Sequence, residues 1–234
     1  ATSAIRSASN GGVLVDLAYQ MTGIKINVIT GDHEADLIYK GVSNALSFHD
    51  KNSLIIDIGG GSTEFIIANK YGPIWRHSFD IGVARLLASH SFSNPITNTE
   101  TAKLKTTLKS NLLILFSAIE MHPVFELIGS SGSFESIAEI IALKSPQKNE
   151  ESETNEVAFN LKELNETLTQ IIKSTKQERI NLKGLVSFRV DTIVFASIII
   201  SFIMEEVKAE NVRLSKYALR EGVLGLIFDN QKDK

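Results

Sequence analysis

Apolar and polar residues follow one another along this chain in patterns that predict an α/β fold. Apolar residues three and four apart predict helices, and short apolar or alternating runs bounded by glycine, asparagine or proline predict strands. The predicted strands cover residues 24–29, 54–58, 64–68, 74–79, 124–128 and 211–214. The predicted helices cover residues 13–21, 33–46, 83–86, 99–121, 134–143, 160–172, 175–183, 193–204 and 219–230.

Residues 53–68 are the most informative stretch, because two apolar strands flank three glycines and two hydroxyl residues. Glycines such as Gly59, Gly60 and Gly61 let backbone amides point at one place, which attracts anions. The dinucleotide fingerprint is excluded because Glu64 stands where its last glycine belongs, and the Walker loop is excluded because no Gly-Lys-Ser/Thr follows. We therefore predict a hairpin that binds phosphate, and a turn without a ligand is the structural alternative.

Glu34 is a candidate because it falls just beyond a predicted strand, in the first turn of the helix over 33–46. Asp32 is its expected N-cap. The Glu34 carboxylate either stabilises the helix dipole alone or faces the crevice outside the strand ends, where α/β proteins bind ligands. Arg6, near the start of the chain, is either a solvated surface charge or a second group at that crevice.

Two later stretches also place polar groups at element ends. Residues 129–133 (Gly-Ser-Ser-Gly-Ser) join a strand to a helix and form a second candidate phosphate or nucleotide site, or Ser133 simply caps the helix. Arg189 and Asp191 precede the helix over 193–204. Here we favour an ion pair between the two residues, with Asp191 as N-cap, over contact with a ligand.

Composition narrows the function classes. The 234 residues suffice for one large or two small domains, and 43% apolar against 22% charged residues is typical of a soluble globular protein. The net charge of −3 gives no basic field for DNA. Cysteine is absent, which excludes disulfides and thiolate metal sites, and the five histidines lack zinc-ligand spacing. No Gly-x-Ser-x-Gly elbow is present for a serine nucleophile.

We expect no signal peptide, because the first residues show no charged region followed by an apolar core, and the most apolar run argues against a membrane protein. Residues 193–204 are about a dozen in number, fewer than the ~20 helical residues that span a bilayer, so we predict a buried core helix. The polar run over 144–157 predicts a solvated loop.

Six stretches, taken in order, resemble one known family. They are Ala1-Thr-Ser-Ala-Ile-Arg6, Thr30-Gly-x-x-Glu34-Ala, Asp57-Ile-Gly-Gly-Gly-Ser-Thr-Glu64, Gly129-Ser-Ser-Gly-Ser133, Arg189-Val-Asp191 and Leu219-Arg-Glu-Gly-Val223. Their order, over nearly the whole chain, resembles the exopolyphosphatase and guanosine-pentaphosphate phosphohydrolase family of the actin, sugar-kinase and chaperone-ATPase superfamily.

The resemblance implies a cytoplasmic enzyme that removes a terminal phosphate from polyphosphate or guanosine pentaphosphate with Mg²⁺. Glu34 matches the glutamate that activates water, and Arg6 matches an arginine that faces the same crevice. Asp57 and Glu64 match the carboxylates placed for the metal. The residues implied in phosphate binding are Gly59, Gly60, Gly61, Ser62, Thr63, Ser131 and Gly132. Phosphoryl transfer needs these residue types, because it depends on positioning and charge stabilisation.

The implied fold is an actin-like mixed sheet flanked by helices. Residues 1–46 would be the end of domain one, 47–216 domain two, and the helix over 217–234 would pack back near domain one. The superfamily's first phosphate hairpin has no match here, so we expect residues 1–234 alone to be nearly inactive. The family more often has Glu at His33 and Arg at Asp36, which bears on substrate preference. A non-catalytic sensor of a polyanion or alarmone is the alternative function, a small-molecule kinase is a third, and a homodimer is left open.

Overall fold

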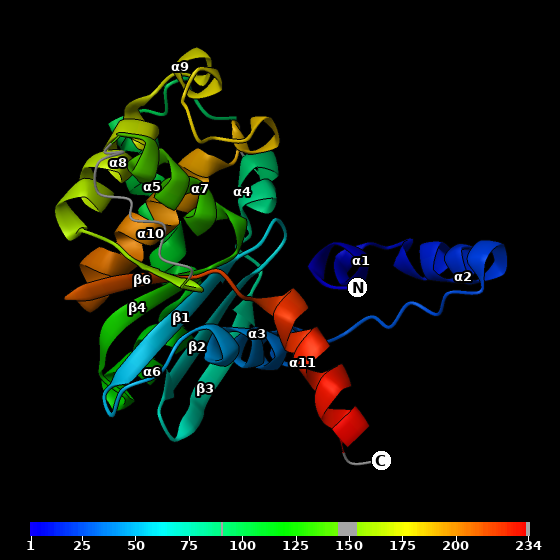
Figure 1. Cartoon of the computed structure of the whole chain (residues 1–234). Coiled ribbons are helices and arrows are strands. Elements are labelled where there is room, and N and C mark those ends of the chain that lie inside the picture. Colours follow the sequence, from blue (N-terminus) through cyan, green and yellow to red (C-terminus); the bar gives the residue numbers. More distant parts are fainter. Residues whose placement is uncertain (90, 145–153, 233–234) are drawn as a thin grey trace.

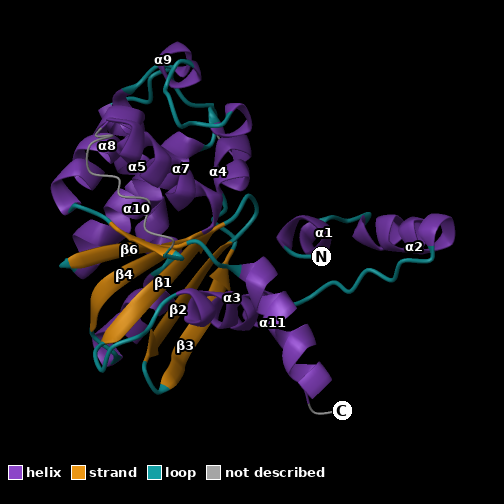
Figure 2. Cartoon of the chain, viewed as in Figure 1, coloured by secondary structure: helices purple, strands orange, loops and turns teal. Residues whose placement is uncertain are grey.

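A computed structural model describes residues 1–89, 91–144 and 154–232, and its centre is a six-stranded mixed sheet. In the order β3-β2-β1-β4-β6-β5, the β1–β4 and β4–β6 pairs are parallel and the others antiparallel (Figures 1 and 2). The strands are β1 (Asn52–Ile58), β2 (Thr63–Asn69), β3 (Gly72–Phe79), β4 (Val124–Ser130), β5 (Glu156–Ala158) and β6 (Asn211–Ser215). The predicted α/β class is confirmed, as is the hairpin of β1 and β2.

Helices cover both faces of this sheet, with α5, α7, α8 and α10 on one side and α3 on the other (Figure 1). The helices are α1 (Ser3–Ser7), α2 (Gly11–Thr22), α3 (Gly31–Ala45), α4 (Val83–Ser89), α5 (Asn98–Asn111), α6 (Leu113–Met121), α7 (Ser131–Lys144), α8 (Leu161–Lys173), α9 (Lys176–Ile180), α10 (Ile193–Val207) and α11 (Leu219–Lys232). A 3-10 turn, η2, covers Ser187–Arg189.

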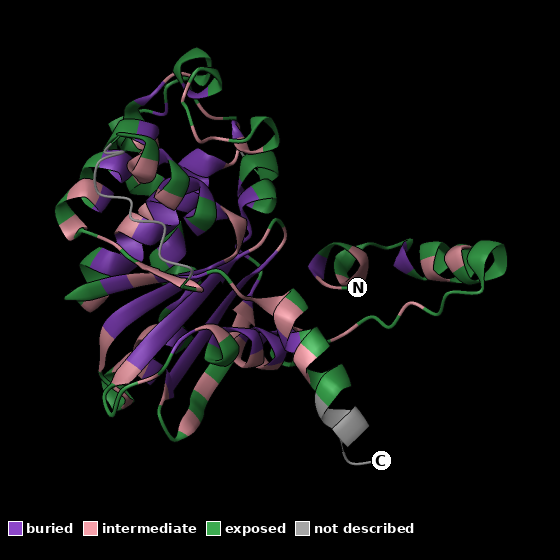
Figure 3. Cartoon of the chain, viewed as in Figure 1, coloured by how far each residue is buried: buried purple, intermediate pink, exposed green. Residues whose placement is uncertain are grey.

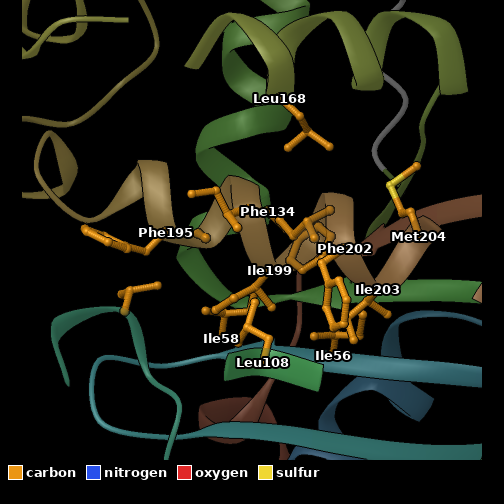
Figure 4. Packing of buried hydrophobic residues seen from close by; sticks show 14 of the residues in the cluster. Ile56, Ile58, Leu108, Phe134, Leu168, Phe195, Ile199, Phe202, Ile203 and Met204 are labelled. Atoms are coloured by element: carbon orange, nitrogen blue, oxygen red, sulfur yellow. The ribbon is translucent and has the colours of Figure 1, made fainter. Parts of the chain in front are cut away.

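Strand β1 shows why the apolar run over 54–58 is nearly continuous. Leu54 and Ile56 pack into the larger core under α5 and α10, whereas Ile55 packs into the smaller core against α3. Successive strand residues point to opposite faces, so a strand covered on both sides needs apolar residues at successive positions. Figure 4 shows Ile56 and Ile58 of β1 within the larger core, next to Leu108 and Ile199.

Helix α10 lies within this larger core, which confirms the buried helix predicted over 193–204 (Figure 4). In the described part of the chain, no helix is both long and apolar enough to cross a bilayer.

The helices α1 and α2 form an arm beside the sheet, and Figure 3 shows that most of α2 is exposed. The strand predicted over 24–29 is wrong: this segment has no sheet partner and returns alongside the first residue, with Ile29 N donating to Ala1 O over 3.0 Å. Alternation indicates an extended chain, but a strand also needs an edge to pair with. The arm contacts the sheet at Gly61, where an added Cβ would lie 2.6 Å from Ser3 Oγ.

Three element boundaries differ from those predicted. The helix predicted over 99–121 is two helices, because Leu112 has ψ 15° and interrupts it. Thr30, not Asp32, caps α3 by accepting from His33 N. Most of the predicted polar loop over 144–157 lies outside the described residues, but Glu156–Ala158 form β5, whose three residues are too few to show a period.

Candidate active site

The glycine turn joins β1 to β2 and presents free backbone amides. Gly59 N donates to Ser62 O over 3.0 Å, while the carbonyls of Gly59 and Gly60 accept from the first amides of α4. Among the described residues, the amides of Gly60, Gly61 and Ser62 have no hydrogen-bond partner. Three unpaired amides in one turn can bind an anion, as the sequence predicts.

Asp57 is held at the end of β1 by two serines of β4 and α7. The Oδ2 atom of Asp57 accepts from Ser130 Oγ at 2.8 Å and Ser131 Oγ at 2.6 Å. Ser130 lies opposite Asp57 in the parallel β1–β4 pair, and Ser131 adopts a left-handed conformation with φ 65°. Burial raises the pKa of Asp57; the serine hydrogen bonds oppose the rise, and the charge of Glu34 adds to it.

Glu64, the second residue of β2, lies directly across from Asp57 in the antiparallel pair. Its Oε1 accepts from Ser62 Oγ at 2.7 Å and from Ser78 Oγ of β3 at 2.6 Å. Burial raises the pKa of Glu64 to about 7; these two hydrogen bonds oppose the rise, and the charges of Glu34 and Asp57 add to it. The two carboxylates therefore share one buried sheet end, where each makes ionisation of the other less favourable.

Glu34 reaches the same end of the sheet from the first turn of α3. It is buried, and its Oε2 lies 3.0 Å from Arg6 Nη1, which also donates to Ile29 O at 2.9 Å. An added Cβ at Gly31 would overlap Ser78, the partner of Glu64, so α3 and β3 approach closely here. A cavity of about 270 Å³ lies between them, lined by Arg6, Thr30, Gly31, Asp32, Ser78 and Asp80.

The structure thus brings Arg6, Glu34, Asp57, Glu64 and the glycine turn to one end of the sheet. Two contributors, Ser78 and Arg85, were missed, and for Ser130, which lies in the predicted stretch 129–133, the contact with Asp57 was missed. Arg85 fixes the turn by donating to Gly61 O at 3.0 Å, and it also donates to Asp80 Oδ1 at 3.1 Å. The sequence gives no local signal for the two serines, because their contacts depend on strand register.

The two predictions on polar partners have different outcomes. The Ser131 hydroxyl donates to Asp57, and a role of Ser131 in phosphate binding stays a prediction. The predicted Arg189–Asp191 pair is wrong, because Asp191 pairs with Lys176 of α9 at 2.8 Å, and Arg189 donates to Ser136 Oγ at 3.0 Å. Sequence spacing favours a local partner, but each of the two side chains has its partner on another helix, α9 for Asp191 and α7 for Arg189.

A larger cavity, of about 800 Å³, lies at the opposite end of the strands. Its central cation, Arg213, bonds Glu126 Oε1 at 2.7 Å and Glu156 Oε2 at 2.8 Å. Because both carboxylates are bound to one guanidinium, this cluster is explained by the pairing of β4, β5 and β6. The smaller cavity is lined by Arg6, the partner of Glu34, and by Ser78, the partner of Glu64, and is the better candidate for chemistry.

The donor set fits a hard cation whose coordination is completed by other groups. Asp57 and Glu64 offer carboxylate oxygens, which Mg²⁺ prefers, and because burial raises the pKa of both, a bound cation would favour their ionised forms. Within the described residues, no three Asp, Glu, His or Cys side chains lie close enough to hold an ion themselves. Mg²⁺ commonly uses one or two carboxylates, with waters and phosphates supplying the rest.

Burial of Glu64 predicts that the metal-free protein loses stability as pH rises. The folded-state pKa, about 7, exceeds the ordinary 4.5, so the stabilisation is fully present below pH 4.5 and is lost as pH rises through 7. The shift corresponds to about 3 kcal/mol in the free energy of unfolding. Urea unfolding in EDTA between pH 4.5 and 8 measures it. Glu64→Gln should flatten this dependence, and parallel curves for the two proteins would contradict the assignment.

The chain is similar to phosphatases over almost its whole length. The model of the Ppx/GppA phosphatase family matches residues 1–230. A bifunctional 3-dehydroquinate synthase/phosphatase of Fusobacterium nucleatum is 30% identical, over 100% of this chain and 34% of its own length. A guanosine-5'-triphosphate,3'-diphosphate pyrophosphatase of Pseudoalteromonas translucida is 31% identical, over 96% of this chain and 43% of its own length. The chain thus spans less than half of these relatives.

Solved structures agree with the fold. An exopolyphosphatase from Cytophaga hutchinsonii has a TM-score of 0.93 and 34% identity, over 98% of this chain and 73% of its own. A Ppx/GppA protein from Aquifex aeolicus has a TM-score of 0.79 at 22% identity, over 100% of this chain and 73% of its own, and shows the fold alone.

Proposed function

The chain belongs to the Ppx/GppA phosphatase family, and from this premise we propose that it carries the site of a phosphoanhydride hydrolase. Its substrates would be inorganic polyphosphate, guanosine pentaphosphate or both. The observation that carries the proposal is the convergence of three free amides, at Gly60, Gly61 and Ser62, with the buried carboxylates of Asp57, Glu64 and Glu34. That set supplies anion binding, a place for a cation and a base at one strand end.

In the proposed reaction, the amides of the glycine turn bind oxygens of the terminal phosphate. The Glu34 carboxylate orients a water and accepts its proton as the water oxygen bonds to phosphorus and the bridging P–O bond breaks. The bridging oxygen and the electron pair of the broken bond leave with the shortened substrate, and the water oxygen stays on the released orthophosphate. Arg6 holds Glu34 at 3.0 Å, and its remaining N–H groups can contact a phosphate oxygen.

Asp57 and Glu64 would hold Mg²⁺ in this scheme. The bound ion would offset charge on the phosphate oxygens and allow both buried carboxylates to stay ionised. Serines 62, 78, 130 and 131 keep the carboxylate oxygens oriented by the hydrogen bonds described above. Supporting groups of this kind fix the geometry of metal-binding carboxylates.

Phosphate release from polyphosphate and from guanosine pentaphosphate by the full-length protein tests the proposal. We expect Mg²⁺-dependent turnover of at least one substrate, with EDTA abolishing it. Binding of either ligand without phosphate release would instead favour the non-catalytic sensor. An enzyme and a sensor would both bind the ligand through the amides of the glycine turn, so turnover, and not affinity, is the decisive measurement.

A further inference from the structure

The start of α4 holds consecutive carbonyls of the glycine turn on the side opposite the free amides. Gly59 O accepts from Val83 N at 3.0 Å. Gly60 O accepts from Ala84 N at 2.9 Å and from Arg85 N at 3.1 Å. These donors belong to the first turn of α4, whose amides have no partner within their own helix. The backbone of α4 thus fixes the first two carbonyls of the turn.

Gly82 shows how closely α4 approaches the turn. An added Cβ at Gly82 would lie 2.4 Å from the carbonyl carbon and oxygen of Gly60, and equally close to the carbonyl carbon of Gly61. No residue larger than glycine therefore fits between the helix start and the turn.

The third carbonyl, Gly61 O, is held by a side chain instead. Arg85 Nε donates to it at 3.0 Å, and no backbone amide in the described part of the chain does so. Two further contacts orient the guanidinium, because Arg85 Nη2 donates to Asp80 Oδ1 at 3.1 Å and to Ser7 Oγ of α1 at 3.3 Å. The donors of a guanidinium lie in one rigid plane, so these contacts help to direct Nε at Gly61 O.

Each held carbonyl sets the direction of the amide that follows it. A trans peptide unit is planar, and its C=O and N–H groups point in opposite directions. Gly61 O and the amide of Ser62 belong to one trans unit. The contact that holds Gly61 O toward Arg85 therefore turns the Ser62 amide to the opposite side, which is also the side of the Gly60 and Gly61 amides.

We infer that Arg85 is a positioning residue that orients the Ser62 amide toward a bound phosphate group without touching that group. Without the guanidinium, the peptide unit of Gly61 and Ser62 is free to rotate, because its carbonyl loses its donor. The amides of Gly60 and Gly61 keep their direction, since the backbone of α4 holds the carbonyls before them. This inference rests on the proposed function, because it takes the glycine turn to bind phosphate.

Amide NMR signals of the full-length protein, labelled at glycine and serine, test the inference residue by residue. The probe is methylenediphosphonate with Mg²⁺, because its P–C–P link cannot be hydrolysed. Binding should shift the amide signals of Gly60, Gly61 and Ser62 in the wild type. Arg85→Met keeps an unbranched side chain but has no donor, so the shift of Ser62 should be lost while that of Gly60 is retained.

Calorimetric titration with the same probe measures the loss of affinity. One hydrogen bond to a charged group contributes about 1.5–3 kcal/mol, so Arg85→Met should bind the probe about 10- to 150-fold more weakly. Arg85→Lys keeps the charge but replaces the planar fork by a single ammonium, so its affinity should stay at least about fivefold below wild type.

Arg76 provides a matched control, because it pairs with one aspartate, Asp36, and its side chain is 40% exposed against 41% for Arg85. Within the described residues it donates to no atom of the glycine turn, so Arg76→Met should leave both the affinity and the Ser62 shift unchanged.

Three results would overturn the inference: wild-type affinity in Arg85→Met, full recovery in Arg85→Lys, or a Ser62 signal that still shifts in Arg85→Met. A lower melting temperature with unchanged affinity would likewise restrict Arg85 to stabilising the fold. Phosphate release is a separate readout. A wild-type protein that binds the probe through these amides but releases no phosphate would refute the proposed hydrolysis and leave the role of Arg85 intact.

Discussion

Replacing Glu34 by glutamine is expected to lower the kcat of phosphate release by about 10²- to 10⁴-fold, the usual contribution of a general base. Glutamine keeps the size and one hydrogen-bond acceptor of the side chain but cannot accept the proton of the attacking water. KM should change little, because the glycine-turn amides and the proposed metal site bind the phosphates. Steady-state phosphate release at saturating Mg²⁺ measures both constants.

The exposed glutamate Glu120 on α6 is the matched control, and Glu120→Gln should leave kcat unchanged. Loss of the Arg6–Glu34 ion pair could also loosen the arm, so the melting temperatures of both variants must be recorded. The pair is partly buried, with 25% of the Arg6 side chain and 9% of Glu34 exposed. A kcat within threefold of wild type in a folded Glu34→Gln protein would remove Glu34 as the base.

What the sequence predicts well here is local. Three consecutive glycines between two apolar runs can only be a tight connection, and the two runs pair with each other as β1 and β2. The first turn of α3 follows from the Thr30-Gly31 break, and so does the position of Glu34. A carboxylate at a strand end or in a first helical turn can thus be located by counting residues from the predicted boundary of the element.

What the sequence does not predict depends on register and on distant partners. Ser78 reaches Glu64 because β3 pairs with β2 residue by residue, and Ser130 reaches Asp57 through the parallel β1–β4 pair. The segment over 24–29 alternates like a strand but finds no edge to join. Likewise, the partner of Asp191 comes from α9, fifteen residues earlier in the chain. Periodicity reports which face a residue occupies and not which neighbour it meets.

Asp57→Asn is expected to separate activity from stability. The carboxamide has nearly the same shape and an oxygen that can accept from Ser130 and Ser131, but it carries no charge to bury. Near pH 8 in EDTA, the melting temperature should therefore equal or exceed that of the wild type, because burial raises the pKa of Asp57 and makes its ionised form costly. Phosphate release should fall at least about 10²-fold, the scale of losing one transition-state charge contact.

The Mg²⁺ dependence of stability distinguishes a metal ligand from a merely buried acid. A ligand that binds the folded state alone raises stability by RT ln(1 + [L]/Kd), so wild type should melt at higher temperature in Mg²⁺ and Asp57→Asn should not. Asp57→Asn also removes a negative charge that raises the pKa of Glu64, so in EDTA the loss of stability due to ionisation of Glu64 should be smaller than in wild type and complete at lower pH.

Glu126 offers the opposite case on the same sheet, because it is a buried carboxylate already paired with Arg213. Glu126→Gln should lower the melting temperature, since it leaves part of a buried guanidinium charge uncompensated, while the Mg²⁺-induced rise stays as in wild type. A buried carboxylate paired with an arginine, such as Glu126, stabilises the folded state. A buried carboxylate without such a partner, such as Asp57, destabilises the folded state until a cation binds. An unchanged Mg²⁺ response in Asp57→Asn would place the cation elsewhere, and Asp57 would then be only a partner of the two serines.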